Sequence, residues 1–216
     1  MKIGGLVKFC LSDFPGRVAA VVFTQGCNFR CPFCHNSSLI PRNVTNGSLI
    51  PEEEFFEFLI LRSSQLDAVV ISGGEPTIQP DLSTFLCRIK AMGFLVKLDT
   101  NGSKPNVLQY LLKNNLVDYI AMDIKAPLHM YNRLSGVRAS ISQVKESIAL
   151  ISQSGIAHEF RTTVVESLLS AKDVWSIQRK LVPSGSTHRL QKFCPEQALD
   201  PALRKYTSTY SGDLSL

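Results

Sequence analysis

Short apolar runs alternate along the chain with amphipathic segments, and this pattern predicts a β/α fold. Residues 18–24 (VAAVVFT) form a run rich in β-branched side chains, which is typical of a strand buried on both faces. Further strands are predicted at residues 68–72, 94–98, 117–122, 158–165 and 188–193. Helices are predicted between them at residues 51–61, 81–92, 105–114, 141–154 and 171–181.

Strands that alternate with helices in this way predict a parallel sheet with right-handed crossovers. Two architectures remain open, an open doubly wound sheet and a partial barrel. A full eight-stranded barrel takes about 250 residues, so six β/α units in 216 residues fit a partial barrel better. Both architectures place the ligand site at the carboxyl ends of the strands. Since no linker, repeat or low-complexity segment interrupts the chain, we expect one domain spanning residues 1–216.

The composition is that of a globular protein, with 44% hydrophobic and 19% charged residues. No apolar run approaches the roughly 18 residues that a membrane span needs, and the start MKIGGLVKF becomes polar too early for a signal peptide. We therefore expect a cytoplasmic protein without a membrane partner. The 23 basic and 18 acidic residues give a net charge of +5 without a long basic run, so dedicated nucleic-acid binding is not expected.

Three of the six cysteines cluster in the loop after the first predicted strand. Residues 26–36 read GCNFRCPFCHN, which places Cys27, Cys31 and Cys34 in a C-x3-C-x2-C spacing. Thiolates are the usual ligands of iron–sulfur clusters. The alternative is a zinc site completed by His35 or a distant residue, but structural zinc normally takes two ligand pairs and the chain has no second C-x2-C or H-x3-H pair. The spacing favours an iron–sulfur centre.

With the aromatic Phe33 just before the last cysteine, this motif resembles that of the radical S-adenosylmethionine (SAM) superfamily. Residues 12–36 resemble the anaerobic ribonucleoside-triphosphate reductase activating proteins, and the resemblance continues along most of the chain. It implies an α/β fold, a partial (β/α)6 barrel of parallel strands. It also implies that Cys27, Cys31 and Cys34 hold a [4Fe-4S] cluster whose fourth iron is open to SAM, with Phe33 beside the cofactor.

The sequence SGGEPT at residues 72–77 follows the second predicted strand. Two glycines let the backbone approach a ligand closely, and a glutamate can accept a hydrogen bond from an amine. An ordinary βα turn is the alternative interpretation. The resemblance implies that Gly73, Gly74 and Glu75 bind the methionyl amino group of SAM.

The sequence DTNG at residues 99–102 follows the third predicted strand and is also compatible with a plain turn. The resemblance implies that Asp99, Thr100 and Asn101 reach the ribose or the methionyl end of SAM. It further implies a monovalent cation near Asp99, Thr100 and Asp123, for which oxygen ligands are chemically suitable.

Two charged motifs complete the candidate site. Asp123 and Lys125 in MDIK resemble the D-x-K motif of glycyl-radical-enzyme activases, and a buried Asp–Lys ion pair is the alternative. Arg161 in FRTTVV could bind the cofactor carboxylate through its forked donors, or it could form a structural salt bridge.

The resemblance implies a radical reaction that needs no side chain as general acid or base. One electron from the reduced cluster cleaves SAM into methionine and a 5′-deoxyadenosyl radical, which takes hydrogen from the substrate. For an activase, that hydrogen comes from a backbone glycine of a glycyl radical enzyme such as an anaerobic ribonucleotide reductase, and a flavodoxin or ferredoxin supplies the electron. The alternatives are a small-molecule radical SAM enzyme similar to 7-carboxy-7-deazaguanine synthase and a non-catalytic zinc-binding module. Those synthases tend to have Asp–Thr after the last cysteine, where this chain has His35–Asn36.

Overall fold

A computed structural model of the protein describes residues 1–44, 49–206 and 214–215. These residues form two compact units, each assembled from separate stretches of chain. The first unit comprises Met1–Asn28, Ser38–Thr100 and Gln109–Ile120, and the second comprises Phe29–Ser37, Asn101–Leu108 and Ala121–Leu216. The single domain expected from the sequence stays a prediction.

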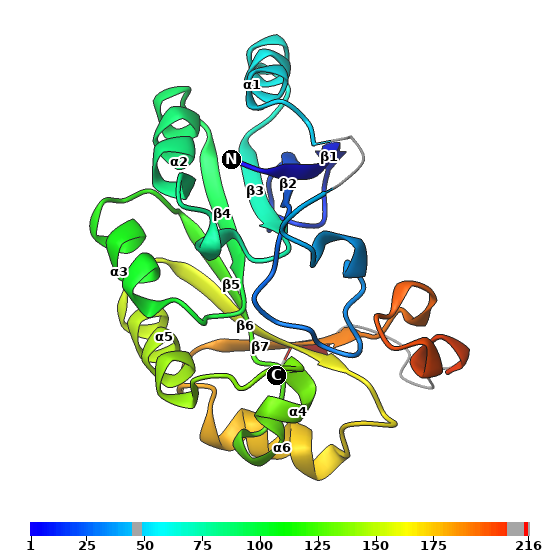
Figure 1. The fold of residues 1–216 in the computed structure, drawn as a ribbon. Helices are drawn as coiled ribbons and strands as arrows, with labels where there is room; N and C mark the ends of the chain where they lie inside the picture. The colour runs from blue at the N-terminus through cyan, green and yellow to red at the C-terminus, as the bar shows by residue number, and fades with distance from the viewer. Residues whose placement is uncertain (45–48, 207–213, 216) are drawn as a thin grey trace. The chain divides into compact units, whose positions relative to one another are not determined.

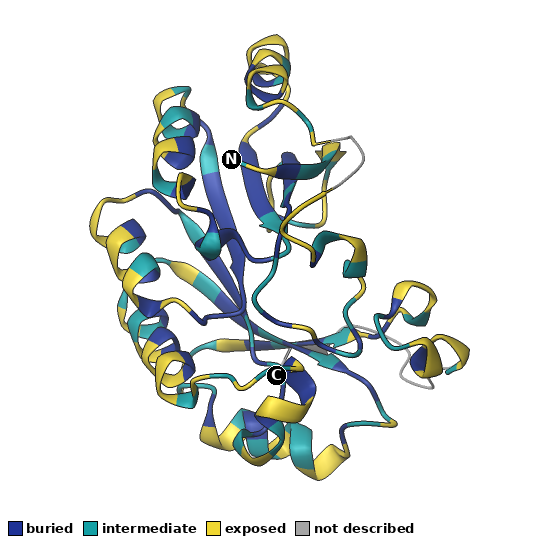
Figure 2. Cartoon of the chain, in the orientation of Figure 1, coloured by how far each residue is buried: buried dark blue, intermediate teal, exposed yellow. Residues whose placement is uncertain are grey.

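The first unit is built on four neighbouring strands, β1 (Ile3–Cys10), β2 (Ala19–Thr24), β3 (Ala68–Gly73) and β4 (Leu95–Thr100). β2, β3 and β4 pair in parallel, and β1 pairs with β2 in the antiparallel direction. The apolar stretch of β3 from Ala68 to Ile71 is fully buried, because a parallel strand is covered on both faces (Figure 2). β1 was not predicted, since it has two glycines and is partly exposed over most of its length.

Two helices of the first unit pack through aromatic side chains. They are α1 (Glu52–Leu61) and α2 (Leu82–Ala91), and α2 lies beside β4 (Figure 1). Phe55, Phe56 and Phe85 form a cluster with ring centroids 5.2–5.3 Å apart. The guanidinium of Arg88 lies 3.7 Å from the centroid of Phe56 and also pairs with Glu52, which ties the two helices together.

The second unit contains the parallel neighbours β6 (Ala157–Val164) and β7 (Thr187–Lys192), which run side by side in Figure 1. β8 (Leu214–Ser215) pairs with β7 in the antiparallel direction. The helices are α4 (Tyr131–Ser135), α5 (Ile141–Gln153) and α6 (Ala171–Lys180). α3 (Pro105–Lys113) and β5 (Tyr119–Asp123) contribute residues to both units.

The predicted elements agree closely with the observed ones. The six predicted strands are β2 to β7 and the five predicted helices are α1, α2, α3, α5 and α6, with ends shifted by no more than two residues. The α/β class with mostly parallel strands is therefore confirmed. β1, α4 and β8 were missed. Within the described ranges, none of the helices combines the length and the apolar character that crossing a bilayer requires.

Candidate active site

The predicted motifs lie at the carboxyl ends of strands, as the β/α pattern requires. Thr24 at the end of β2 pairs with Gly73 at the end of β3, so these two strands end level with each other. Asp99 and Thr100 were expected to follow a strand, but they are the last two residues of β4, because that strand continues beyond the apolar run. Asp123 is the last residue of β5.

In the first unit, the Gly-Gly-Glu segment is pressed against the loop that follows β2. The backbone N–H of Gly74 donates to the Thr24 carbonyl oxygen at 2.9 Å, and that of Glu75 donates to the Gly26 carbonyl oxygen at 2.9 Å. A Cβ atom on Gly74 would lie 2.1 Å from the Gly26 oxygen. Gly73 has φ +106°, a conformation that side chains rarely adopt. Both positions therefore require glycine.

Glu75 is buried, with 1% of its surface exposed, and its carboxylate is fixed by neighbouring donors. Its Oε1 accepts from the Thr77 N–H at 3.1 Å, the Thr77 hydroxyl at 2.5 Å and the Thr100 hydroxyl at 2.8 Å. Glu75 is also the N-cap of the short helix Pro76–Ile78. A buried, oriented carboxylate of this kind suits an ammonium group of a ligand. The role of Thr77 was missed, although its place two residues after a capping glutamate is a local signal.

Asp99 has a partner on each carboxylate oxygen. Oδ1 accepts from the Lys97 ammonium at 2.7 Å, and Oδ2 accepts from the Ser72 hydroxyl at 3.1 Å. Lys97 is itself only 1% exposed. Lys97 was not predicted, because it stands inside an apolar run. It shares a strand face with Asp99 because the two are two residues apart. The charge of Asp99 is thus neutralised within the first unit.

The three clustered cysteines fall in both units. In the first, the backbone N–H of Cys27 donates to the Ile40 carbonyl oxygen at 3.0 Å. In the second, Cys31 and Cys34 belong to one tight turn, in which the Cys34 N–H donates to the Cys31 carbonyl oxygen at 3.0 Å. The Cys31 thiol lies 3.8 Å from the Ser135 carbonyl oxygen. Burial raises the pKa of the Cys31 thiol to about 11 and also raises that of Cys34.

These thiols fit the chemistry of an iron–sulfur centre. None of the six cysteines, all of which the structure describes, forms a disulfide, so the three clustered thiols are available as ligands. Among residues 1–44, 49–206 and 214–215, no three His, Cys, Asp or Glu side chains converge on a single-ion site. A cubane cluster does not require that convergence, because each thiolate binds a different iron. Iron binding would remove the protons of these thiols, whose pKa values burial raises.

Asp123, Lys125 and Arg161 form a charged group in the second unit. Lys125 Nζ donates to Asp123 Oδ2 at 2.9 Å, and Arg161 Nε donates to Asp123 Oδ1 at 2.8 Å. Burial alone would raise the pKa of Asp123, but the two cations outweigh it and hold the pKa below its usual range. Burial alone would lower the pKa of Lys125, and Asp123 reverses that shift. The ion pairs kept open as structural alternatives are therefore present.

The two remaining predicted residues are buried in the second unit. Phe33 is 4% exposed and Asn101 is 5% exposed. The Asn101 side-chain oxygen accepts from the Ser103 N–H at 2.9 Å, which is the Asx turn that the sequence also allowed.

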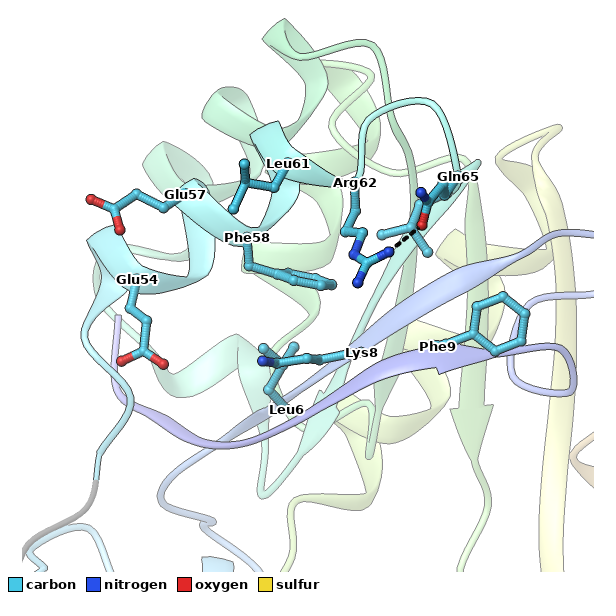
Figure 3. Close-up of a pocket in the computed structure, with 10 residues that line it drawn as sticks. Leu6, Lys8, Phe9, Glu54, Glu57, Phe58, Leu61, Arg62 and Gln65 are labelled. Atoms are coloured by element: carbon cyan, nitrogen blue, oxygen red, sulfur yellow. Dashed lines mark hydrogen bonds between the residues drawn. The ribbon is translucent and has the colours of Figure 1, made fainter.

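A separate cavity of about 440 Å³ lies between β1 and α1 (Figure 3). Phe9, Lys8 and Phe58 line it, and Arg62 on its rim donates to the side-chain oxygen of Gln65 at 2.5 Å. None of the predicted site residues contributes to its walls. The cavity is therefore separate from the predicted motifs.

Comparison with known proteins connects these motifs to one family. Residues 21–168 match the Radical SAM superfamily. A protein of Methanocaldococcus jannaschii with the provisional name of glycyl-radical enzyme activating enzyme is 35% identical over 208 residues, covering 94% of this chain and 84% of that protein. The pyruvate formate-lyase-activating enzyme of Clostridium pasteurianum is 31% identical over 129 residues, covering 57% of this chain and 52% of that enzyme.

The fold is also similar to solved structures. The structure of anSMEcpe with bound AdoMet superimposes with a TM-score of 0.59 at 19% identity, covering 88% of this chain and 54% of that chain. This likeness concerns the fold, and it agrees with the partial barrel that the sequence predicts. Since the family match also covers more than half of the chain, this protein belongs to the radical SAM superfamily, whose members use a [4Fe-4S] cluster and S-adenosylmethionine.

Proposed function

We propose that this radical SAM enzyme is an activase that installs a glycyl radical on a larger partner enzyme. The observation that carries the proposal is the similarity to the Methanocaldococcus jannaschii protein, which extends over 94% of the chain and is not confined to the cysteine motif. The match to a pyruvate formate-lyase-activating enzyme supports the same class of partner. An anaerobic ribonucleotide reductase is the proposed partner, and a flavodoxin or ferredoxin is the proposed electron donor.

We assign the cluster to Cys27, Cys31 and Cys34. When bound, the cluster and SAM would supply the radical chemistry that removes a hydrogen atom from the partner's glycine. The chain's own part is to bind and orient these groups. None of the three cysteines forms a disulfide and Cys31 is buried, which supports this assignment.

We propose that the residues of the predicted motifs contact SAM. In the first unit, Gly73 and Gly74 allow close backbone approach, and the fixed carboxylate of Glu75 accepts from the methionyl ammonium. The remaining proposed contacts are Phe33, Asp99, Thr100, Asn101, Asp123, Lys125 and Arg161.

The two carboxylates proposed for the monovalent cation already have cationic partners. Asp99 already pairs with Lys97, and Asp123 already pairs with Lys125 and Arg161. Each carboxylate that the cation would neutralise therefore has a cationic partner of its own. The cytoplasmic location stays a prediction.

The test is anaerobic reconstitution of the full chain with iron and sulfide, followed by dithionite and SAM. We expect 5′-deoxyadenosine by chromatography and, with an anaerobic ribonucleotide reductase present, a glycyl-radical doublet in the electron paramagnetic resonance (EPR) spectrum. Cys27→Ser, Cys31→Ser and Cys34→Ser should abolish both signals. Cys87→Ser is the matched control, because that cysteine is exposed and outside the motif.

The possible outcomes separate the classes of function. Product without a glycyl radical on any glycyl radical enzyme would move the assignment to a small-molecule radical reaction. Zinc in place of iron, with no product, would favour a binding module and overturn the proposal.

A further inference from the structure

A chain of polar side chains runs through the second unit from α6 to the residue that follows β5. Thr162 on β6 is 1% exposed, and His188 on β7 has no exposed surface. The Thr162 hydroxyl donates to the Ile124 carbonyl oxygen at 2.9 Å, and it lies 3.0 Å from Nε2 of His188. The side-chain amide of Gln178, on α6, meets the other ring nitrogen, Nδ1. A buried network of this kind rigidifies the structure around it when every member is satisfied.

The chain ends at the residue that separates the two charged side chains of the D-x-K motif. Ile124 lies between Asp123 and Lys125. Its backbone N–H donates to the Arg161 carbonyl oxygen at 2.8 Å, and its carbonyl oxygen accepts from Thr162. Arg161 also binds the Asp123 carboxylate through Nε. Two adjacent residues of β6 therefore hold both backbone polar groups of Ile124 and the first charge of the motif.

The protons of the chain can be assigned one by one. The Thr162 hydroxyl has a single proton, which it donates to Ile124, so His188 Nε2 must carry a proton and donate to the Thr162 oxygen. Burial lowers the pKa of His188 to about 4, and the neutral ring has only one N–H. Nδ1 is therefore an acceptor. The oxygen of the Gln178 amide faces it, so the chain is complete once a half-turn of the amide brings the nitrogen to that place.

We propose that Thr162 and His188 are positioning residues for the Asp123–Lys125 motif, in which His188 orients the hydroxyl that holds the Ile124 carbonyl. This inference rests on the proposed function, because it assumes that the motif contacts SAM. The Ile124 carbonyl belongs to the planar peptide group that leads into Lys125. Fixing that carbonyl fixes the direction in which the Lys125 backbone starts. A site whose supporting residues are lost is held more loosely and binds its ligand less tightly.

The first test is hydrogen exchange of backbone amides, followed by nuclear magnetic resonance (NMR) on the full chain without iron. Thr162→Val removes the hydroxyl and nearly keeps the shape of the side chain, so the protection of the Ile124 amide should fall about fivefold to tenfold. Thr162→Ser keeps the hydroxyl and should retain most of the protection. Thr187→Val is the matched control, because it makes the same change at an exposed position of β7. Unchanged exchange at Ile124 in Thr162→Val would overturn the inference.

A second measurement examines the ring of His188 directly. In ¹H–¹⁵N spectra of the wild type at neutral pH, we expect the ring proton on Nε2, and the exposed His129 serves as the reference. A proton on Nδ1 would draw the Thr162 proton to Nε2 and overturn the inference. His188→Leu should lower the protection of the Ile124 amide as Thr162→Val does, because the hydroxyl then loses the neighbour that orients it.

The reconstituted enzyme separates positioning from stability. At a temperature at which all variants are folded, Thr162→Val should bind SAM about fivefold more weakly in calorimetry, and Thr162→Ser should bind SAM like wild type. Wild-type affinity in Thr162→Val would overturn the inference and leave the proposed function intact. A wild type that takes up no iron or binds no SAM would instead overturn the proposed function, while exchange at Ile124 would still decide whether the chain holds this residue.

Discussion

The polar groups of the two units are prepared for ligands in different ways. In the first unit, Glu75 Oε1 accepts three hydrogen bonds and Asp99 pairs with Lys97 and Ser72 before any ligand is bound. In the second unit, burial keeps the Cys31 thiol protonated, and the hydroxyl of Tyr131 lacks a partner. The first arrangement is preorganised, so it holds its geometry alone. The second unit pairs Asp123 with Lys125 and Arg161 in the same way, so the difference between the units lies in the Cys31 thiol and the Tyr131 hydroxyl.

The largest expected effect is that of a methyl group at Gly74. Gly74→Ala would place Cβ 2.1 Å from the Gly26 carbonyl oxygen. Because this oxygen belongs to the backbone, it cannot move aside as the end of a flexible side chain could. We expect a loss of about 3 kcal/mol or more in the free energy of unfolding, measured by urea denaturation. Gly5→Ala is the control, because its nearest contact would be an ordinary 3.7 Å. Equal stability of the two variants would show that the first unit is not preorganised.

The next effect concerns binding and should leave folding intact. In Glu75→Gln, the amide oxygen still accepts from Thr77 and Thr100, so the hydrogen bonds survive while the charge is lost. We expect SAM affinity to fall by about 30-fold, or about 2 kcal/mol, in calorimetry on the reconstituted enzyme. Glu57→Gln removes the same charge from an exposed position of the same unit. If both variants bind SAM like wild type, Glu75 has no part in binding the ammonium group.

Acid should weaken the second unit, which contains all four histidines of the chain. Burial lowers the pKa of His188 to about 4, and its Nε2 lies 3.0 Å from the Thr162 hydroxyl. The unfolded chain takes up a proton near its ordinary pKa of about 6.5, whereas the folded protein resists protonation until the pH is much lower. Stability therefore falls with pH below about 6.5, by about 1.4 kcal/mol between pH 8 and pH 5.5.

Urea unfolding at the two pH values checks this expectation in wild type and His188→Gln. The variant should lose most of the pH dependence, whereas His129→Gln, at an exposed position, should retain it. A pH dependence that survives in His188→Gln would place the acid sensitivity elsewhere.

The smallest expected effect is that of monovalent cations. Because Asp99 and Asp123 have internal cationic partners, replacing potassium chloride by choline chloride at constant ionic strength should change SAM affinity by less than about twofold. Lys97→Met removes one of these partners and should make binding depend on potassium. Lys90→Met is the control, since Lys90 forms a 2.7 Å ion pair with Asp118 at a more exposed position. If SAM binding to the wild type strongly required potassium, that result would support the cation site.

Much of the fold was predictable because its signals are local. The strands β2 to β7 are short apolar runs that are separated by amphipathic helices. Runs of this kind are readily recognised in a sequence as buried strands. β1 escaped because it contains two glycines and stays partly exposed, so its apolar pattern is weak. α4 escaped because five residues are too few for a helical period to be recognised.

The candidate site likewise has some features that could be predicted from the sequence and others that could not. The cysteine spacing, the Gly-Gly-Glu turn and their place after strands could be predicted, because each depends on a few adjacent residues. The buried pair of Lys97 with Asp99 and the hydrogen bond from Thr100 to Glu75 became visible only in the fold. The same holds for the hydroxyl of Tyr131, which is buried without a hydrogen-bond partner among the described residues. Burial and hydrogen-bond satisfaction depend on which distant segments pack together, and no local pattern records that.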